Sequence, residues 1–159
     1  MRSSFLFLAA ALALIAASAT AVRAQGADAM ATVSGGALVW NDAKVPGFDS
    51  GMKLAVINGR PDSTGLYTLR LSFPDGYRFP AHWHPMAEHV TVLEGTLVLA
   101  MGESPQESGL KGYGAGDYLY LPPRQPHYGG ARGYTVVQLH GQGPFVINLA
   151  TPAAPTGRR

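Results

Sequence analysis

The sequence of 159 residues contains no cysteine. Without cysteine the chain forms no structural disulfide and offers no thiol for a lipid anchor. Charged residues are also scarce, at 14%, and their Lys and Arg members do not form the cluster that would hold the phosphates of a nucleic acid. We therefore expect no nucleic-acid partner.

Long apolar runs are missing except near the N-terminus. There Arg2 precedes an apolar stretch over residues 5–15, and small residues follow as far as Ala24. This pattern is typical of a secretory signal peptide that is cleaved after Ala24. A membrane anchor is the alternative, although the apolar run is short against the roughly 20 residues that span a bilayer. We expect an exported protein, periplasmic or secreted, with no membrane span after cleavage.

Cleavage would leave residues 25–159, with ten basic and ten acidic residues once Arg2 and Arg23 are gone. This length suits one domain with a core. The segments at either end are rich in small residues, polar residues or proline, which favours disorder. The expected organisation is a signal peptide (1–24), a flexible N-terminal segment (25–45), one folded domain (46–150) and a disordered tail (151–159).

A helical pattern is also lacking, because no stretch of the mature chain has a convincing 3.6-residue period. Short alternating segments rich in Val, Leu, Tyr and Thr predict strands instead, and Gly- and Pro-containing turns separate them. Nine such strands indicate a β-sandwich or barrel. The expected strands are residues 37–40, 54–57, 65–73, 78–84, 88–93, 96–101, 117–121, 134–140 and 145–149.

A turn at Glu94–Gly95 predicts that residues 88–93 pair with residues 96–101 in a hairpin. Cross-strand partners point to the same side of a sheet. In this register Glu88 faces Met101 and looks into an apolar interior.

A second reversal at residues 74–77 predicts another hairpin. It would place Leu69 opposite His82 and Tyr67 opposite His84. A slip of one residue would put other side chains there, because register and face change together.

Histidine is scarce as well, yet three of the five histidines lie within HWHPMAEHVTVLEG, residues 82–95. His82 and His84 stand two apart, so on a strand both imidazoles point to the same face. Glu88 begins the next expected strand, and His127 follows a proline-rich turn. Three imidazoles and a carboxylate suit a divalent transition metal and leave coordination positions open.

These residues also have the spacing of a known family. The stretch resembles the first signature of the cupin superfamily, and the chain after residue 115 is similar to the second. The first signature is matched at Gly76, His82, His84, Glu88 and Gly95, and the second at Gly116, Pro122 and His127.

The resemblance covers roughly residues 50–150. It implies an all-β double-stranded β-helix, the jelly-roll architecture, as a single domain. It also implies that His82, His84, Glu88 and His127 bind one metal ion, with Fe, Mn, Zn, Ni and Cu as candidates.

Two positions depart from the second signature. Arg124 stands where glycine is usual, and Ala131 where asparagine is usual. Both are turn or support positions, and neither is an expected ligand. An arginine held at positive φ there would cost on the order of 1 kcal/mol.

Four further residues are candidates for the pocket or its surroundings. Alternation turns His89 away from Glu88, so it either faces outward or lies behind the ligands, and it is the alternative to Glu88 as a ligand. Gln138 and His140 share one strand face and either reach the pocket or form hydrogen bonds on a packed strand. Tyr67 is either a core aromatic residue or part of the cavity wall.

The resemblance implies a range of activities and no single reaction, so no catalytic residue is assigned. A metal-dependent enzyme acting on a small molecule is one hypothesis, with dioxygenase chemistry preferred over isomerase chemistry. A non-catalytic cupin that binds or senses a metal-held ligand is the alternative. A homodimer that packs outward residues such as Trp83, His89 and Leu93 is compatible with both, and a place in the core between the sheets is the alternative for Trp83.

Overall fold

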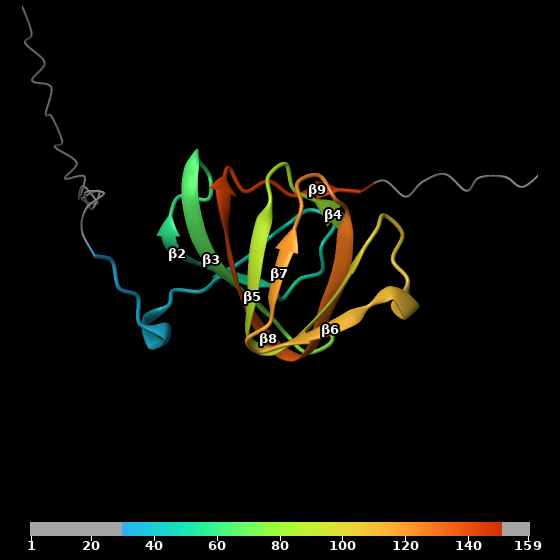
Figure 1. Ribbon diagram of the computed structural model, residues 1–159. Helices are drawn as coiled ribbons and strands as arrows, with labels where there is room; N and C mark the ends of the chain where they lie inside the picture. Colours follow the sequence, from blue (N-terminus) through green and yellow to red (C-terminus); the bar gives the residue numbers. More distant parts are fainter. Residues whose placement is uncertain (1–29, 151–159) are drawn as a thin grey trace, which may run out of the picture. The chain divides into compact units, whose positions relative to one another are not determined.

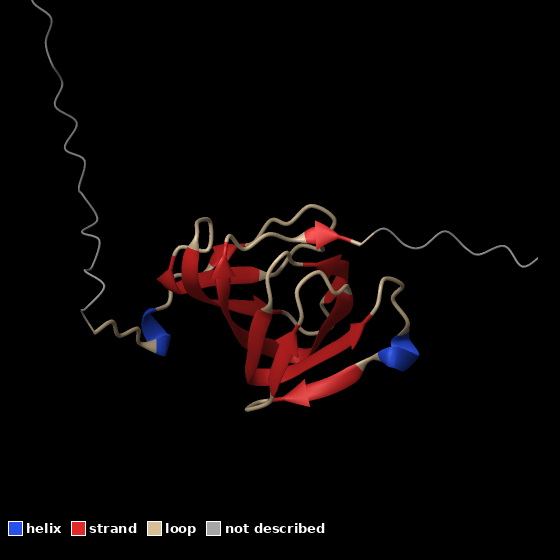
Figure 2. Ribbon diagram, turned by 45° about the horizontal axis from the view of Figure 1, so that its top comes forward, coloured by secondary structure: helices blue, strands red, loops and turns tan. Residues whose placement is uncertain are grey.

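The computed structural model describes residues 30–150. The predicted signal peptide (1–24), the first part of the predicted N-terminal segment (25–29) and the predicted tail (151–159) lie outside the described residues. The described part is all-β, with two single-turn 3₁₀ segments and no α-helix (Figure 2). The predicted all-β class is therefore confirmed.

Nine strands follow one another along the described chain (Figure 1). They are β1 (Asn41–Asp42), β2 (Lys53–Gly59), β3 (Gly65–Phe73), β4 (Arg78–Trp83), β5 (Glu88–Met101), β6 (Lys111–Gly114), β7 (Tyr118–Leu121), β8 (His127–Gly143) and β9 (Asn148–Leu149), with 3₁₀ turns at η1 (Gly35–Ala37) and η2 (Glu107–Gly109).

Two long strands, β5 and β8, hold the barrel together. They pair antiparallel along their length, from Glu88 opposite Gly141 to Met101 opposite His127. The first half of β5 also pairs with β7 and its second half with β6. The first half of β8 pairs with β4 and its second half with β3. Each long strand therefore passes from one side of the barrel to the other, and β2, β1 and β9 extend the two edges.

The core lies between the two sides and is almost wholly apolar. Strand alternation places Val90 and Val92 of β5 inward, in one core cluster with Leu69 of β3 and Val137 of β8, and all four are buried. Glu88 continues the same row of β5 and is only 3% exposed. The expectation that Glu88 faces an apolar interior agrees with this position.

The predicted hairpin at Glu94–Gly95 is wrong. β5 runs through these residues as one strand, and its register against β8 shifts on either side of Glu94, which marks a bulge. Gly95 has the positive φ, +72°, that a turn would need. The chain continues because β8 runs alongside and supplies hydrogen-bonding partners, so the glycine bends the strand instead of reversing it. Glu88 accordingly lies opposite Leu121 and Gly141, and not opposite Met101.

The predicted pairing of Leu69 with His82 is also wrong, and with it the whole second hairpin. β3 pairs with β2 and β8, and His82 of β4 lies opposite His127 of β8. The turn between the strands is closed by a 3.2 Å hydrogen bond from the Tyr77 N–H to the Pro74 carbonyl. It carries the chain from one half of β8 to the other, so β3 and β4 do not pair.

Smaller differences concern the short strands. Residues 37–40 form no strand, and the nearest pairing is β1, within the segment predicted to be flexible. β6 was not predicted, because its sequence KGYG lacks an apolar alternation. Of residues 145–149, only the last two form a strand.

Arg124 is the one non-glycine residue with positive φ in the described chain, at 59°. Its N–H donates a 2.7 Å hydrogen bond to the His84 carbonyl, which ties the turn before β8 to the end of β4.

We expect Arg124→Gly to raise the free energy of unfolding by about 1 kcal/mol, since glycine adopts this conformation without a Cβ clash. Urea denaturation measures the change. The control is Arg132→Gly on β8, which should destabilise; a loss of stability in both variants would contradict the strain argument.

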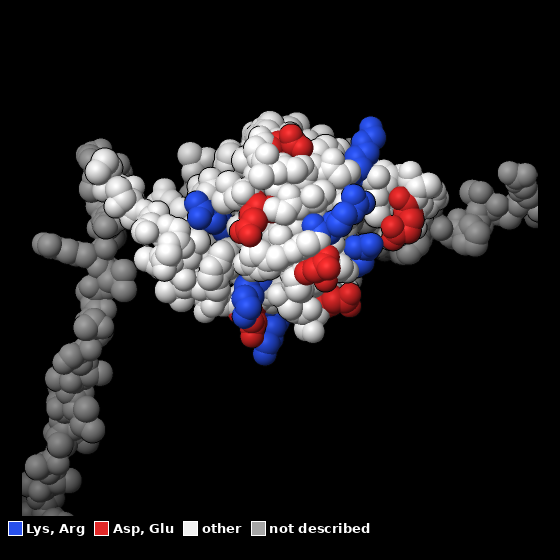
Figure 3. All heavy atoms as spheres, turned by 90° about the horizontal axis from the view of Figure 1, so that it is seen from below, with Lys and Arg blue, Asp and Glu red and all other residues white. Residues whose placement is uncertain are grey.

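The surface carries charges of both signs. On the face in Figure 3, Lys and Arg side chains lie among Asp and Glu side chains without forming a patch of one sign. Among the described residues, no helix has the length and apolar character needed to cross a membrane.

Candidate metal centre

Three strands bring the four expected ligands to one place. His82 is the next-to-last residue of β4, and His84 follows the end of that strand. Glu88 is the first residue of β5, and His127 is the first residue of β8. The i, i+2 spacing puts both imidazoles of the β4 pair on the inward face, and the β4–β8 register sets His127 opposite His82. All four side chains are buried, between 3% and 6% exposed.

The three histidines form a compact cluster. One ligand nitrogen from each lies within 4.8 Å of the others, a spacing that can hold one metal ion. The ring of His82 lies 4.3 Å from that of His127 and 5.0 Å from that of His84, centre to centre. This is the only such group of three or more metal-ligating side chains in residues 30–150.

Backbone carbonyls fix which nitrogen of each ring faces the cluster. His82 Nδ1 lies 2.8 Å from the Pro80 carbonyl oxygen, and His127 Nδ1 lies 3.1 Å from that of Gln125. His84 Nδ1 lies 2.9 Å from the carbonyl oxygen of Val146. A carbonyl only accepts, so each Nδ1 carries the hydrogen and donates it. In the neutral rings, Nε2 then carries the lone pair that a metal needs.

The three imidazoles are neutral near pH 7. Burial, with a smaller contribution from the nearby His127, lowers the pKa of His82 to about 3 and that of His84 to about 4. Burial also lowers the pKa of His127. No proton has to leave these rings before they coordinate a cation.

Glu88 lies beside the histidines. Its Oε2 is 3.1 Å from His84 Nε2 and 3.7 Å from His127 Nε2. Burial raises the pKa of Glu88 to about 8, so below that pH the carboxyl group is protonated and donates its hydrogen to His84 Nε2. The short contact is therefore a hydrogen bond between neutral groups and not an ion pair. The other oxygen, Oε1, is buried without a hydrogen-bonding partner.

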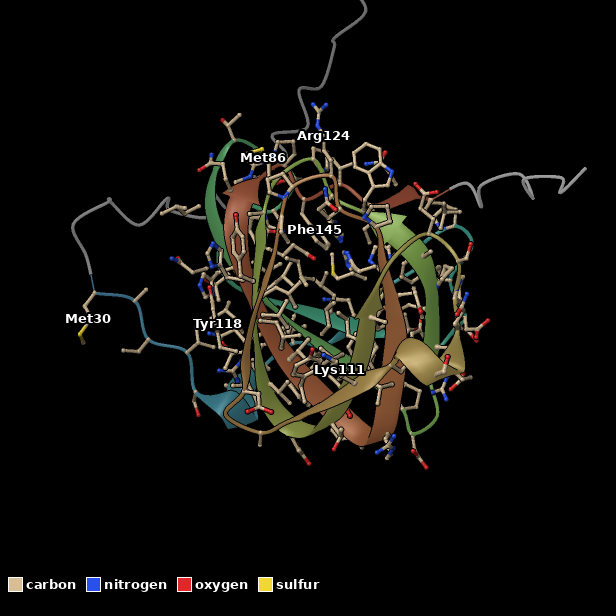
Figure 4. All side chains as sticks on the ribbon, turned by 45° about the vertical axis from the view of Figure 1, so that its right-hand side comes forward. Met30, Met86, Lys111, Tyr118, Arg124 and Phe145 are labelled. Atoms are coloured by element: carbon tan, nitrogen blue, oxygen red, sulfur yellow. The ribbon has the colours of Figure 1, made fainter. Side chains whose placement is uncertain are left out.

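Two phenylalanines hold the outer sides of the histidine rings, and sequence analysis did not single out either. Phe145 stacks on His84 with ring centres 5.2 Å apart and planes 13° apart. Phe48 meets His82 edge-on at 5.0 Å. Phe145 is adjacent to Val146, whose carbonyl accepts the hydrogen bond from His84, so this segment orients the His84 ring by both stacking and hydrogen bonding. Figure 4 shows Phe145 toward the interior of the barrel, with Met86 and Arg124 on the loops at its upper end.

The remaining candidates lie outside the cavity next to the histidines. His89 and His140 stack on each other across β5 and β8, with ring centres 5.1 Å apart, and His89 Nδ1 is hydrogen bonded to the Tyr118 hydroxyl. Gln138 accepts a 3.1 Å hydrogen bond from Arg70 on the same outer face. His89 thus occupies the outward position that alternation favoured.

Tyr67 is closer to the centre than these residues. It is 3% exposed and packs against Phe145, with ring centres 5.7 Å apart. Burial and the charge of Glu88 both raise its pKa. It lines a surface pocket with His89 and His140 and does not line the cavity at the histidines.

A scan against protein-family models finds a match, and the matched segment includes the candidate metal centre. Residues 69–140 match the family model described as Cupin domain, and this segment contains all four candidate ligands. No curated protein sequence matches the chain.

Solved structures share the fold at low sequence identity. The polyketide cyclase RemF from Streptomyces resistomycificus is 16% identical, with a TM-score of 0.65 over 79% of this chain and 88% of that one. A cupin 2 conserved barrel domain protein from Rhodopseudomonas palustris is 14% identical, with a TM-score of 0.60 over 77% and 86%. The DMSP lyase DddQ from Ruegeria pomeroyi is 20% identical, with a TM-score of 0.58 over 75% and 64%. These likenesses confirm the predicted jelly-roll architecture.

Proposed function

We propose that the chain, whose fold is that of cupin structures and whose residues 69–140 match a cupin domain model, is a metal-binding cupin that acts on a small molecule. His82, His84 and His127 would hold one divalent transition metal through Nε2, and Glu88 would add a carboxylate oxygen. The observation that carries this proposal is the convergence of three buried, neutral imidazoles whose Nδ1 atoms are all engaged elsewhere.

The donor set fits such a metal. Imidazole nitrogen with one carboxylate oxygen suits Fe, Mn, Ni, Cu and Zn better than Ca or Mg, which prefer oxygen alone. The partnerless Oε1 of Glu88 is a buried acceptor that a cation would satisfy. When bound, the metal supplies a Lewis-acid or redox centre with open coordination positions.

The test is calorimetric titration of the metal-free protein with Zn²⁺, Mn²⁺, Ni²⁺, Cu²⁺ and, under anaerobic conditions, Fe²⁺. We expect one ion per chain for at least one of these metals. A stoichiometry near zero for every metal would refute the proposed centre.

Metal binding should release a proton from Glu88. At pH 7 its carboxyl group, with a pKa of about 8, is mostly protonated, whereas the histidines are already neutral. We expect about one proton per metal at pH 7 and fewer as the pH rises above 8, so the affinity should rise with pH and then level off. Titration in two buffers of different ionisation enthalpy counts the proton. Glu88→Gln has no carboxyl proton to lose, and an unchanged count in this variant would contradict the assignment.

The choice of chemistry depends on what else lines the cavity. Among the described residues, the four ligands are the only ionisable side chains there. An isomerase that moves protons by a separate side-chain base has no candidate group, whereas oxygen-dependent chemistry centred on the metal needs none. We therefore favour a dioxygenase. Oxygen uptake by the iron-loaded protein with phenolic and diketone compounds tests this, and no uptake with any of them would count against it.

The same scarcity of acids and bases favours a second candidate, a cupin that binds a metal-held ligand without converting it. Calorimetry across a panel of small molecules, with product analysis of the same samples, separates the two. Binding without any product would support the second candidate.

Export is a further part of the proposal, and it rests on residues 1–24. N-terminal sequencing of the protein recovered from the periplasm or medium should begin at residue 25. Recovery of an intact N-terminus from the cytoplasm would contradict it. A homodimer also stays a prediction, which sedimentation at micromolar concentration would test.

A further inference from the structure

The cavity next to the histidines is polar at one place only. It has a volume of about 60 Å³ and seventeen lining residues. Four of these are the candidate ligands, and the other thirteen are aliphatic side chains, phenylalanines and one methionine. Within the described chain, no Lys, Arg, Ser, Thr, Asn or Gln side chain reaches its wall.

This distribution limits what a ligand can carry. A hydroxyl or amide group buried against hydrocarbon without a partner costs free energy, and a buried charge without a partner costs far more. A ligand can therefore place one polar group at the histidines, while the rest of it that lies within the cavity has to be hydrocarbon. Sugars, zwitterions and dicarboxylates each have a second polar group that this wall leaves without a partner.

The volume limits the size of the ligand. A site of about 60 Å³ has room for roughly four to six water-sized groups. Phe48 and Phe145, which pack on His82 and His84, form part of the wall. The body of a ligand held at the histidines therefore lies against these two rings and the aliphatic residues behind them.

We infer that the cavity takes a short ligand with a single polar group, which faces the metal, on a hydrocarbon body of a few carbon atoms. This inference rests on the proposed function, because the metal is the partner of the polar group. It adds the chemical class of the ligand, which the histidine cluster alone does not define.

Three probes of equal size test the inference: butanoate, 3-hydroxypropanoate and β-alanine. Each has six non-hydrogen atoms and the same carboxylate end, and the far end is a methyl, a hydroxyl or an ammonium group. Calorimetry with the zinc-loaded full chain at pH 8 measures their affinities, after elemental analysis has established the zinc content. We expect butanoate to bind at least about tenfold more tightly than 3-hydroxypropanoate, and β-alanine to bind more weakly still.

The outcomes distinguish failure of this inference from failure of the proposed metal-binding function. Zinc at one ion per chain, with 3-hydroxypropanoate or β-alanine binding as tightly as butanoate, overturns the inference and leaves the metal centre intact. Zinc at one per chain without binding of any probe also overturns it. Failure to load zinc or any other divalent metal refutes the proposed function, and the inference falls with it.

A size series gives a second measurement. Phe48→Ala removes a ring from the cavity wall and should shift the preference from butanoate toward hexanoate by about tenfold or more. The matched control is Val56→Ala on the exposed side of β2, which should leave the ratio unchanged. An equal ratio of the two acids in Phe48→Ala, Val56→Ala and the unmodified protein would place the binding site elsewhere.

Discussion

His127→Ala is expected to lower the affinity for the bound metal by at least about a hundredfold. His127 is the one donor supplied by β8, and without it only two of the three imidazoles of the cluster remain, both near the end of β4, together with the Glu88 oxygen. Groups that merely orient metal ligands contribute about 10- to 100-fold, so the loss of a ligand itself should exceed that range. Competition with a chromophoric chelator measures the affinity, and elemental analysis gives the content.

The controls for this variant are the two histidines on the outer face. His140→Ala and His89→Ala should retain full metal content, because these rings stack on each other outside the cavity. A loss of metal in His89→Ala would revive the alternative in which His89 replaces Glu88 as a ligand. Equal metal content in all three variants would remove His127 from the site. Urea denaturation of the metal-free proteins establishes that each variant is folded.

The spacing of the histidines along the sequence was enough to identify the candidate ligands, because the position of a residue on a strand decides which face its side chain points to. Residues two apart share a face, so His82 and His84 converge whatever the rest of the fold does. The carbonyl groups that orient them could not be found in this way. The partner of His84 is the backbone of Val146, 62 residues further along, and any residue type there would offer the same carbonyl. Side-chain identity therefore says nothing about this contact.

The same contrast explains the errors in strand pairing. Alternation predicted most strands, because each pattern depends on the burial of one face. Whether Gly95 forms a turn or a bulge depends on β8, whose pairing residues lie some 40 positions away along the chain. A glycine at positive φ serves either a turn or a bulge, and only the presence of a partner strand decides between them.

Gly95→Ala is expected to destabilise the protein by about 3 kcal/mol. A Cβ at this position would lie 2.2 Å from the carbonyl oxygen of Tyr134 and 2.6 Å from Thr135 Oγ1, both on β8. The backbone would also be held at φ +72°, which alanine disfavours. Thr135 Oγ1 accepts a hydrogen bond from the Thr96 N–H and donates to the Thr96 carbonyl, so moving it aside breaks the pairing at the bend. Urea denaturation gives the change in the free energy of unfolding.

Gly133→Ala separates the two causes. Gly133 has the same φ of +72°, but a Cβ there would meet nothing within 4 Å. Its substitution should therefore show the backbone cost alone, about 1 kcal/mol. An equal loss in both variants would mean that β8 yields to the new methyl group without cost. A larger loss at Gly95 would show that the close approach of β5 and β8 holds the bend, and with it the position of Glu88 at the end of β5.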